Sequence, residues 1–181
     1  NPNTSLYNDL KKIILDDNFS WNYMKSNTWF DINASHKLIY DPENDNTFQK
    51  SSMHHHSFLL RSDLNNLYAK VNSPYMEDVN RMYCEIFNAN RDVMKSFNMM
   101  CRCAANETQP YNGPDGKTRA HVDHDFPHKN MLIYLTNAGG NTFVEDEEFA
   151  PEEDDVIIFE GLHWHQLPKH KRRIVLVMTY I

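Results

Sequence analysis

The chain changes from helical to extended character near residue 98, and this change constrains the fold more than any other feature. Before it, apolar residues recur at three-to-four spacing; after it, short apolar or alternating segments are separated by turn residues. The expected strands are 99–106, 118–124, 130–136, 141–145, 155–159 and 173–180. Helices followed by this series of strands predict an α+β fold, a small barrel of two sheets with helices against one face.

Two helices are expected in the first half of the chain. The first runs from Leu6 to Leu15, with apolar residues on one stripe, and Asp16-Asp17-Asn18 ends it. The second opens at Ser73-Pro74, with Ser as the N-cap and Pro at the first helical position, and its apolar stripe continues to Phe97. We expect both stripes to pack against the barrel.

Length and composition predict a single domain. The 181 residues, 40% of them hydrophobic, are enough for one packed core. We expect residues 1–181 to form one unit, in which 1–98 supply helical support and N-terminal strands and 99–181 form the barrel core. The net charge of −7 argues against nucleic acid or an anionic membrane as partner. No apolar run is long enough for a membrane span.

The cysteines indicate a reducing compartment. Cys84, Cys101 and Cys103 have no zinc-like spacing, and an odd number without a signal peptide favours free thiols. We therefore expect a cytoplasmic protein, in the host cytoplasm if a virus encodes it.

A candidate metal site lies in the barrel half. His121-Val122-Asp123 places an imidazole and a carboxylate on one side of an extended segment, and a histidine from a neighbouring strand would complete the set. Two imidazoles and one carboxylate can hold Fe(II) on one face and leave the opposite face open. His163 and His165 are both candidates for the third ligand, because they share strand parity.

The segment around this motif resembles the jelly-roll core of the 2-oxoglutarate- and Fe(II)-dependent oxygenases, closest to the prolyl hydroxylase branch. Tyr111 stands ten residues before His121, Tyr134-Leu135-Thr136 corresponds to a Tyr-Leu-Asn strand, and Gly139-Gly140 follows. Near the C-terminus, an aromatic residue precedes a histidine by six positions, and Arg173 opens an apolar strand. The resemblance covers roughly residues 99–181 and implies a double-stranded β-helix, the jelly-roll or cupin-like barrel.

The resemblance also implies roles for individual residues. His121, Asp123 and His165 would bind Fe(II) and act as the catalytic metal site. Arg173 and Tyr134 would bind the distal carboxylate of the co-substrate 2-oxoglutarate, and Tyr111 would lie near the metal. O2 would take the remaining coordination position, and ascorbate would serve in assays. Because Asp123 is retained, hydroxylation is expected rather than halogenation.

Two choices remain open in this assignment. The number of residues between Phe159 and the histidine matches the family for His165 as the distal ligand. The number of residues between the histidine and the arginine matches the family better for His163. Arg172 competes with Arg173 as the 2-oxoglutarate anchor, and the apolar pattern after Arg173 favours Arg173. The other histidines are expected outside the metal site: His124, His128 and His170 at the surface or pocket rim, and His54-His55-His56 in a partly exposed loop or strand edge.

The function expected from these residues is a dioxygenase that couples decarboxylation of 2-oxoglutarate to succinate with hydroxylation of a C–H bond. The substrate would be a small molecule, an amino acid or a peptide, with a prolyl residue implied by the family branch alone. The alternative is a cupin-type metal-binding barrel that acts as an isomerase or binding module without oxidative turnover. Nothing in the sequence determines the oligomeric state.

Overall fold

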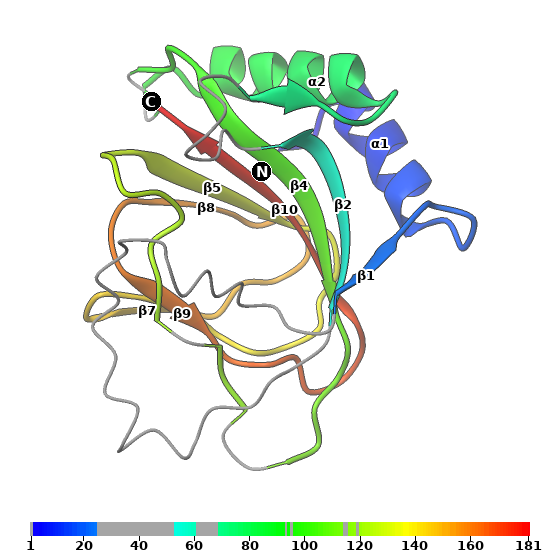
Figure 1. Cartoon of the computed structure of the whole chain (residues 1–181), viewed down its shortest axis with the longest axis vertical. Coiled ribbons are helices and arrows are strands. Elements are labelled where there is room, and N and C mark those ends of the chain that lie inside the picture. The colour runs from blue at the N-terminus through cyan, green and yellow to red at the C-terminus, as the bar shows by residue number, and fades with distance from the viewer. Residues whose placement is uncertain are drawn as a thin grey trace.

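The structure is a computed structural model that describes residues 2–24, 53–60, 69–92, 94, 96–113, 116–118 and 120–181. Within these residues, two antiparallel sheets face one another, and two helices cover the outside of the larger sheet (Figure 1). The larger sheet has the strand order β1 (Asn22–Met24), β2 (Met53–Leu60), β4 (Met100–Thr108), β10 (Arg173–Tyr180), β5 (Lys129–Tyr134) and β8 (Val156–Phe159), with β3 (Lys70–Val71) beside β2. The smaller sheet has the order β7 (Glu147–Phe149), β6 (Thr142–Val144) and β9 (His163–His165).

From β4 onward the chain crosses repeatedly between the two sheets. After β4, the segment that contains Lys117 and His121 forms bridges to Gln166 and His163 at the edge of the smaller sheet. The chain then visits the larger sheet with β5, the smaller with β6 and β7, the larger with β8, the smaller with β9 and the larger with β10. This alternation is a double-stranded β-helix, and it confirms the predicted fold class.

Side chains of the larger sheet alternate strictly between its two faces. On β10, Ile174, Leu176 and Met178 point to the helices, whereas Val175 and Val177 point into the barrel. The same alternation on β5 sends Ile133 to the helices and Leu132 into the barrel. The continuous apolar runs of these strands follow from burial on both faces.

Helix α1 (Ser5–Leu15) lies where the sequence predicts it. The Thr4 hydroxyl caps it by accepting a hydrogen bond from the Tyr7 backbone N–H at 3.1 Å, and the chain turns extended at Asp16. Tyr7, Leu10 and Ile14 are its buried residues. They pack in one core with α2 and the larger sheet, so the apolar stripe of the helix packs against the barrel as predicted.

Helix α2 (Met76–Ala89) is shorter than predicted. Tyr75 occupies the N-cap position, and Ser73 instead accepts a bond from the Tyr75 backbone N–H at 3.3 Å. The helix ends before Asn90, whose side-chain amide donates to the Ile86 carbonyl at 2.7 Å. The apolar residues beyond it continue the core without continuing the helix. Among the described residues, neither helix is long and apolar enough to cross a membrane.

Several expected strands are present with shifted bounds, and one is not a strand. Among the described residues of the expected strand 118–124, only His121 forms a bridge, to His163, whereas the strand at 173–180 matches β10. The short strands β7 and β9 were not expected. His54 and His55 are partly exposed in a strand, as expected, but β2 lies between β1 and β4 rather than at a sheet edge, and His56 is buried. Since β2 of the first half pairs with β4, the larger sheet spans both parts of the predicted single domain; the division at residue 98 stays a prediction.

Candidate metal centre

The segment ending at His121 lies antiparallel to β9. His121 and His163 exchange two backbone hydrogen bonds, at 2.9 Å and 3.0 Å. Directly opposed residues of an antiparallel pair project their side chains to the same side. His165 follows two positions after His163 and shares its side of β9. Three imidazoles from two adjacent segments therefore converge.

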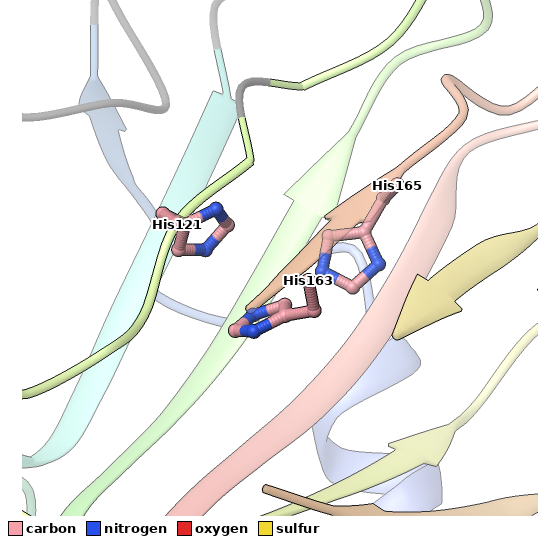
Figure 2. Close-up of side chains that lie close together, drawn as sticks. All are labelled: His121, His163 and His165. Atoms are coloured by element: carbon pink, nitrogen blue, oxygen red, sulfur yellow. The ribbon is translucent and has the colours of Figure 1, made fainter. Parts of the chain in front are cut away.

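The convergence is close enough for one ion. His121, His163 and His165 each offer a ring nitrogen, and these atoms all lie within 4.8 Å of one another. Figure 2 shows the three rings, His121 on the loop and the other two on β9. The ring centroids of His121 and His163 are 4.3 Å apart, and those of His121 and His165 are 6.2 Å apart. The pairing of His121 with both β9 histidines agrees with the predicted neighbouring-strand ligand.

Asp123 lies beside His163, and its two carboxylate oxygens face different partners. Oδ2 is 3.8 Å from His163 Nε2, and Oδ1 accepts a hydrogen bond from Arg102 Nη1 at 2.9 Å. Burial opposes ionisation of Asp123, but the positive charge of Arg102 outweighs it, with smaller contributions from the surrounding histidines, so the pKa of Asp123 lies well below its ordinary range. The carboxylate is thus an anion whenever the fold is intact.

Hydrogen bonds to Nδ1 orient the rings of both β9 histidines. His163 Nδ1 lies 3.3 Å from the Gly161 carbonyl, and because a carbonyl only accepts, Nδ1 carries the proton and Nε2 is free to bind a metal in the neutral ring. His165 Nδ1 lies 2.9 Å from Thr142 Oγ1, and Thr142 also bonds to the Tyr134 hydroxyl. A chain of three side chains therefore connects His165 to Tyr134.

Both β9 histidines are held in the neutral form that metal binding requires. Burial lowers the pKa of His163 to about 4, with a further contribution from His121. Burial, His163 and Arg173 together lower the pKa of His165 well below its ordinary value. No proton has to be displaced from either ring at neutral pH.

Arg173 is buried at the start of β10 and points into the barrel. Its Nη1 donates to the Gln166 carbonyl at 2.7 Å, and in the part of the chain that the structure describes it forms no ion pair with a carboxylate. Burial lowers the pKa of Arg173 and the nearby Tyr134 raises it. Its neighbour Arg172 points the other way, donating to the Leu15 carbonyl of α1 and lying 3.7 Å from Glu107.

Tyr111 lies at the far end of the paired segment. Its backbone N–H donates to the Pro168 carbonyl at 2.9 Å, and its ring covers Gly113 and Gly116, where any Cβ would collide with it. The described contacts hold the ring against this turn, so the expected role of Tyr111 near the metal stays a prediction. The Gly139-Gly140 pair has a clear structural reason: Gly140 has φ +90°, and a Cβ there would lie 2.8 Å from the Leu167 carbonyl oxygen.

Sequence reasoning missed two polar residues of the centre and misplaced two histidines. Arg102 is the one basic residue of β4 and stands between two cysteines, and this was the available signal. Thr142 gave none, because a threonine is ordinary in a strand. His124 and His128 are buried rather than at the surface, with His124 Nε2 2.7 Å from the Thr179 hydroxyl. His170 is exposed, as expected.

Comparisons with known proteins support the fold. No protein-family model matches the sequence, and no curated protein matches it. A solved structure described as an oxidoreductase of the 2OG-Fe(II) oxygenase family, from Burkholderia pseudomallei, is similar over 80% of this chain and 72% of its own, with TM-score 0.57 and 16% identity. At this identity the likeness shows a shared fold.

Two further structures are more distantly similar. A predicted oxalate decarboxylase from Thermotoga maritima covers 73% of this chain and 83% of its own, at TM-score 0.42 and 10% identity. The Cupin_2 domain of an XRE family transcriptional regulator from Enterobacter cloacae covers 44% and 80%, at TM-score 0.37 and 8% identity. Likeness at this level carries no argument about function.

Proposed function

We propose that this protein is an Fe(II)- and 2-oxoglutarate-dependent dioxygenase. In the reaction, 2-oxoglutarate, O2 and a substrate C–H bond give succinate, CO2 and a C–OH group. One observation carries the proposal: the barrel that gathers the histidines and Asp123 also buries Arg173, whose charge has no acidic partner among the described residues. A buried cation is costly unless an anion pairs with it.

The residues around His121 fit an Fe(II) ion. His121, Asp123 and one histidine of β9 would supply two imidazole nitrogens and one carboxylate oxygen, the set that leaves open positions on one face. When bound, iron supplies the binding positions for the 2-oxo acid and for O2 and the redox chemistry that attacks a C–H bond. The protein keeps the imidazoles neutral and the carboxylate ionised.

Arg173 and Tyr134 would bind the distal carboxylate of 2-oxoglutarate. Arg173 offers a planar, permanently charged set of donors. If His165 Nδ1 donates to Thr142, the Thr142 hydroxyl can donate its own proton to the Tyr134 oxygen. In that arrangement the Tyr134 proton is left to donate to a carboxylate at Arg173. Thr142 would thereby set the direction of the hydrogen-bond chain between the metal site and the anchor.

The geometry favours His163 over His165 as the distal ligand. His163 is 3.8 Å from Asp123, and its ring is closer than that of His165 to His121. His165 is hydrogen-bonded to Thr142, and the charge of Arg173 contributes to lowering the pKa of His165. The spacing-based choice of His165 stays a prediction; Mn(II) titration of His163→Ala and His165→Ala separates the two. The larger loss of affinity identifies the ligand.

The substrate class follows from the family branch only. A prolyl or other amino-acid residue, free or in a peptide, is the substrate that the prolyl-hydroxylase resemblance implies. Screening amino acids and peptides by mass spectrometry for a gain of about 16 Da, the mass of one oxygen atom, tests it.

The two adjacent arginines provide a matched test of the mechanism. Succinate production is measured with Fe(II), ascorbate and 2-oxoglutarate for wild type, Arg173→Ala and Arg172→Ala. Losing a buried charged partner costs about 2–5 kcal/mol, so Arg173→Ala should lose at least about thirtyfold in kcat/KM for 2-oxoglutarate. Arg172→Ala, on the opposite face, should keep most of it. Equal turnover in all three proteins, or none in iron-loaded wild type, would rule out the mechanism.

A second candidate has its own supporting observation. The three imidazoles alone form a compact set, and Asp123 is engaged by Arg102. A cupin-type barrel could hold a metal with these histidines and act without oxidative turnover. In that case Asp123→Ala would leave Mn(II) affinity nearly unchanged, whereas the oxygenase proposal expects a clear loss.

A further inference from the structure

A buried ion pair joins the candidate metal centre to the middle of the larger sheet. Arg102 comes from β4 and Asp123 from the irregular segment after His121, and their side chains are 19% and 10% exposed. In the sheet, Arg102 pairs with Thr179 on β10, whose neighbour on β5 is Asn130. This row lies on the barrel-facing side, far along β10 from Arg173. Arg102 therefore belongs to the metal end of the barrel rather than to the 2-oxoglutarate anchor.

The Arg102 contact constrains the orientation of Asp123. Residues 122–128 form no helix or strand, so no ladder of backbone bonds fixes the carboxylate. Arg102 bonds to Oδ1 at 2.9 Å, and Oδ2 faces His163, 3.8 Å from its Nε2. A charged hydrogen bond to one carboxylate oxygen withdraws electron density from that oxygen and favours metal binding through the other.

We propose that Arg102 is a positioning residue that holds Asp123 as a one-oxygen metal ligand. The inference rests on the metal site of the proposed function and adds a residue that the spacing motif does not contain. By bonding to Oδ1, Arg102 favours binding of the ion through Oδ2 alone over chelation through both oxygens, which would consume a coordination position needed by O2 or 2-oxoglutarate. Hydrogen-bonded supports of this kind typically change metal affinity by 10–100-fold.

The opposite role is physically distinct and testable. Arg102 could instead compete with the ion for Asp123, since both are cations drawn to the same carboxylate. A competitor lowers metal affinity, so its removal would tighten binding. A positioning residue raises affinity, so its removal would weaken binding.

The experiment is a Mn(II) titration followed by electron paramagnetic resonance, on the full chain. Arg102→Leu is expected to bind Mn(II) about 10–100-fold more weakly than wild type. Arg102→Lys, which keeps a cation within reach, should recover to within about threefold. Arg172→Leu is the matched control, because it removes the 3.7 Å pair with Glu107 on the helix-facing side of the same strand. It should leave affinity unchanged.

A double-variant cycle separates positioning from a general structural effect. If Arg102 acts through Asp123, adding Arg102→Leu to Asp123→Ala should cause no further loss of Mn(II) affinity. This pair also removes both charges together, so it folds even if Arg102→Leu alone does not. A further loss in the Asp123→Ala background, or tighter binding in Arg102→Leu, overturns the proposal.

The readout keeps this proposal separate from the oxygenase proposal. Mn(II) binding with the expected cycle but without succinate production retains Arg102 as a positioning residue and rejects the oxygenase. Succinate production together with a Mn(II) affinity that Arg102→Leu does not change supports the oxygenase and rejects Arg102 as a positioning residue. If wild type binds neither Mn(II) nor Fe(II), the positioning role is rejected with the metal site.

Discussion

The two faces of the larger sheet bury different kinds of side chain, although the same strands supply both. The helix-facing side joins Leu10 of α1, Tyr83 of α2 and Leu176 of β10 in one apolar core. The barrel-facing side combines Val175 and Val177 with the buried polar residues Arg173, Thr179 and Asn130. Thr142 and His163 are buried on the smaller sheet, which faces it. Buried polar groups cost free energy unless they are paired. The first face therefore stabilises the fold, and the second carries the candidate chemistry.

Adjacent residues on β10 give the sharpest test of this division. Leu176→Ala, on the helix-facing side, should lower the free energy of unfolding by about 2–5 kcal/mol, because it leaves a cavity in a packed core. Urea denaturation measures this, and succinate production per folded molecule should not change. Val177→Ala should cost less stability but alter turnover, since Val177 lines the barrel. Equal effects of the two substitutions on turnover would contradict the division.

Acid should weaken the barrel-facing side of the metal-free protein first. The unfolded chain takes up a proton at His163 near its ordinary pKa of 6.5, but the buried ring does so only near a pKa of about 4. Stability from neutral His163 is thus complete above pH 6.5 and is lost as pH falls through 4. The loss should be on the order of a few kcal/mol.

Urea unfolding between pH 7 and pH 4, with chelator present, measures this loss. His163→Asn should flatten the slope in part, because His165 is shifted in the same direction. A free energy of unfolding that stays constant over this range would show that the histidines are not buried in solution.

Tyr134→Phe should have a smaller effect, confined to the co-substrate. The substitution removes the hydroxyl that bonds to Thr142 while keeping the ring. Losing one hydrogen bond to a charged group should raise the KM for 2-oxoglutarate about tenfold with little change in kcat. Steady-state succinate assays measure it, with Tyr83→Phe on the helix-facing side as the control. An unchanged KM would remove Tyr134 from the anchor.

The smallest expected effect has the opposite sign. Asn130 is fully buried on the barrel-facing side, and neither polar atom of its side chain has a partner among the described residues. Asn130→Leu keeps the branched shape of the side chain and removes the unpaired amide, so it should raise the free energy of unfolding by about 1 kcal/mol. Thermal and urea denaturation measure it. Lower stability would mean that the amide is satisfied in solution.

Local patterns predicted those features that depend on neighbours in the chain. The helical stripe of α1 and the strand at β10 each follow from the local pattern of apolar residues. The end of α2 was not predictable, because its apolar stripe continues to Met94 and Phe97, which pack in the core outside the helix. The strand expected at 118–124 failed because pairing of its described residues to β9 is limited to the bridge between His121 and His163.

The sequence by itself predicted a two-sheet barrel and placed His121 and Asp123 on one side of an extended segment, because strand periodicity sets which side chains share a face. The later histidine and the arginine came from the resemblance to the oxygenases. Only the tertiary structure decided how they meet. It placed His163 beside Asp123, turned Arg172 toward the helices and Arg173 inward, and brought Arg102 to the metal end of the barrel. These outcomes depend on register between segments far apart in the chain, and spacing along one strand carries no information about register.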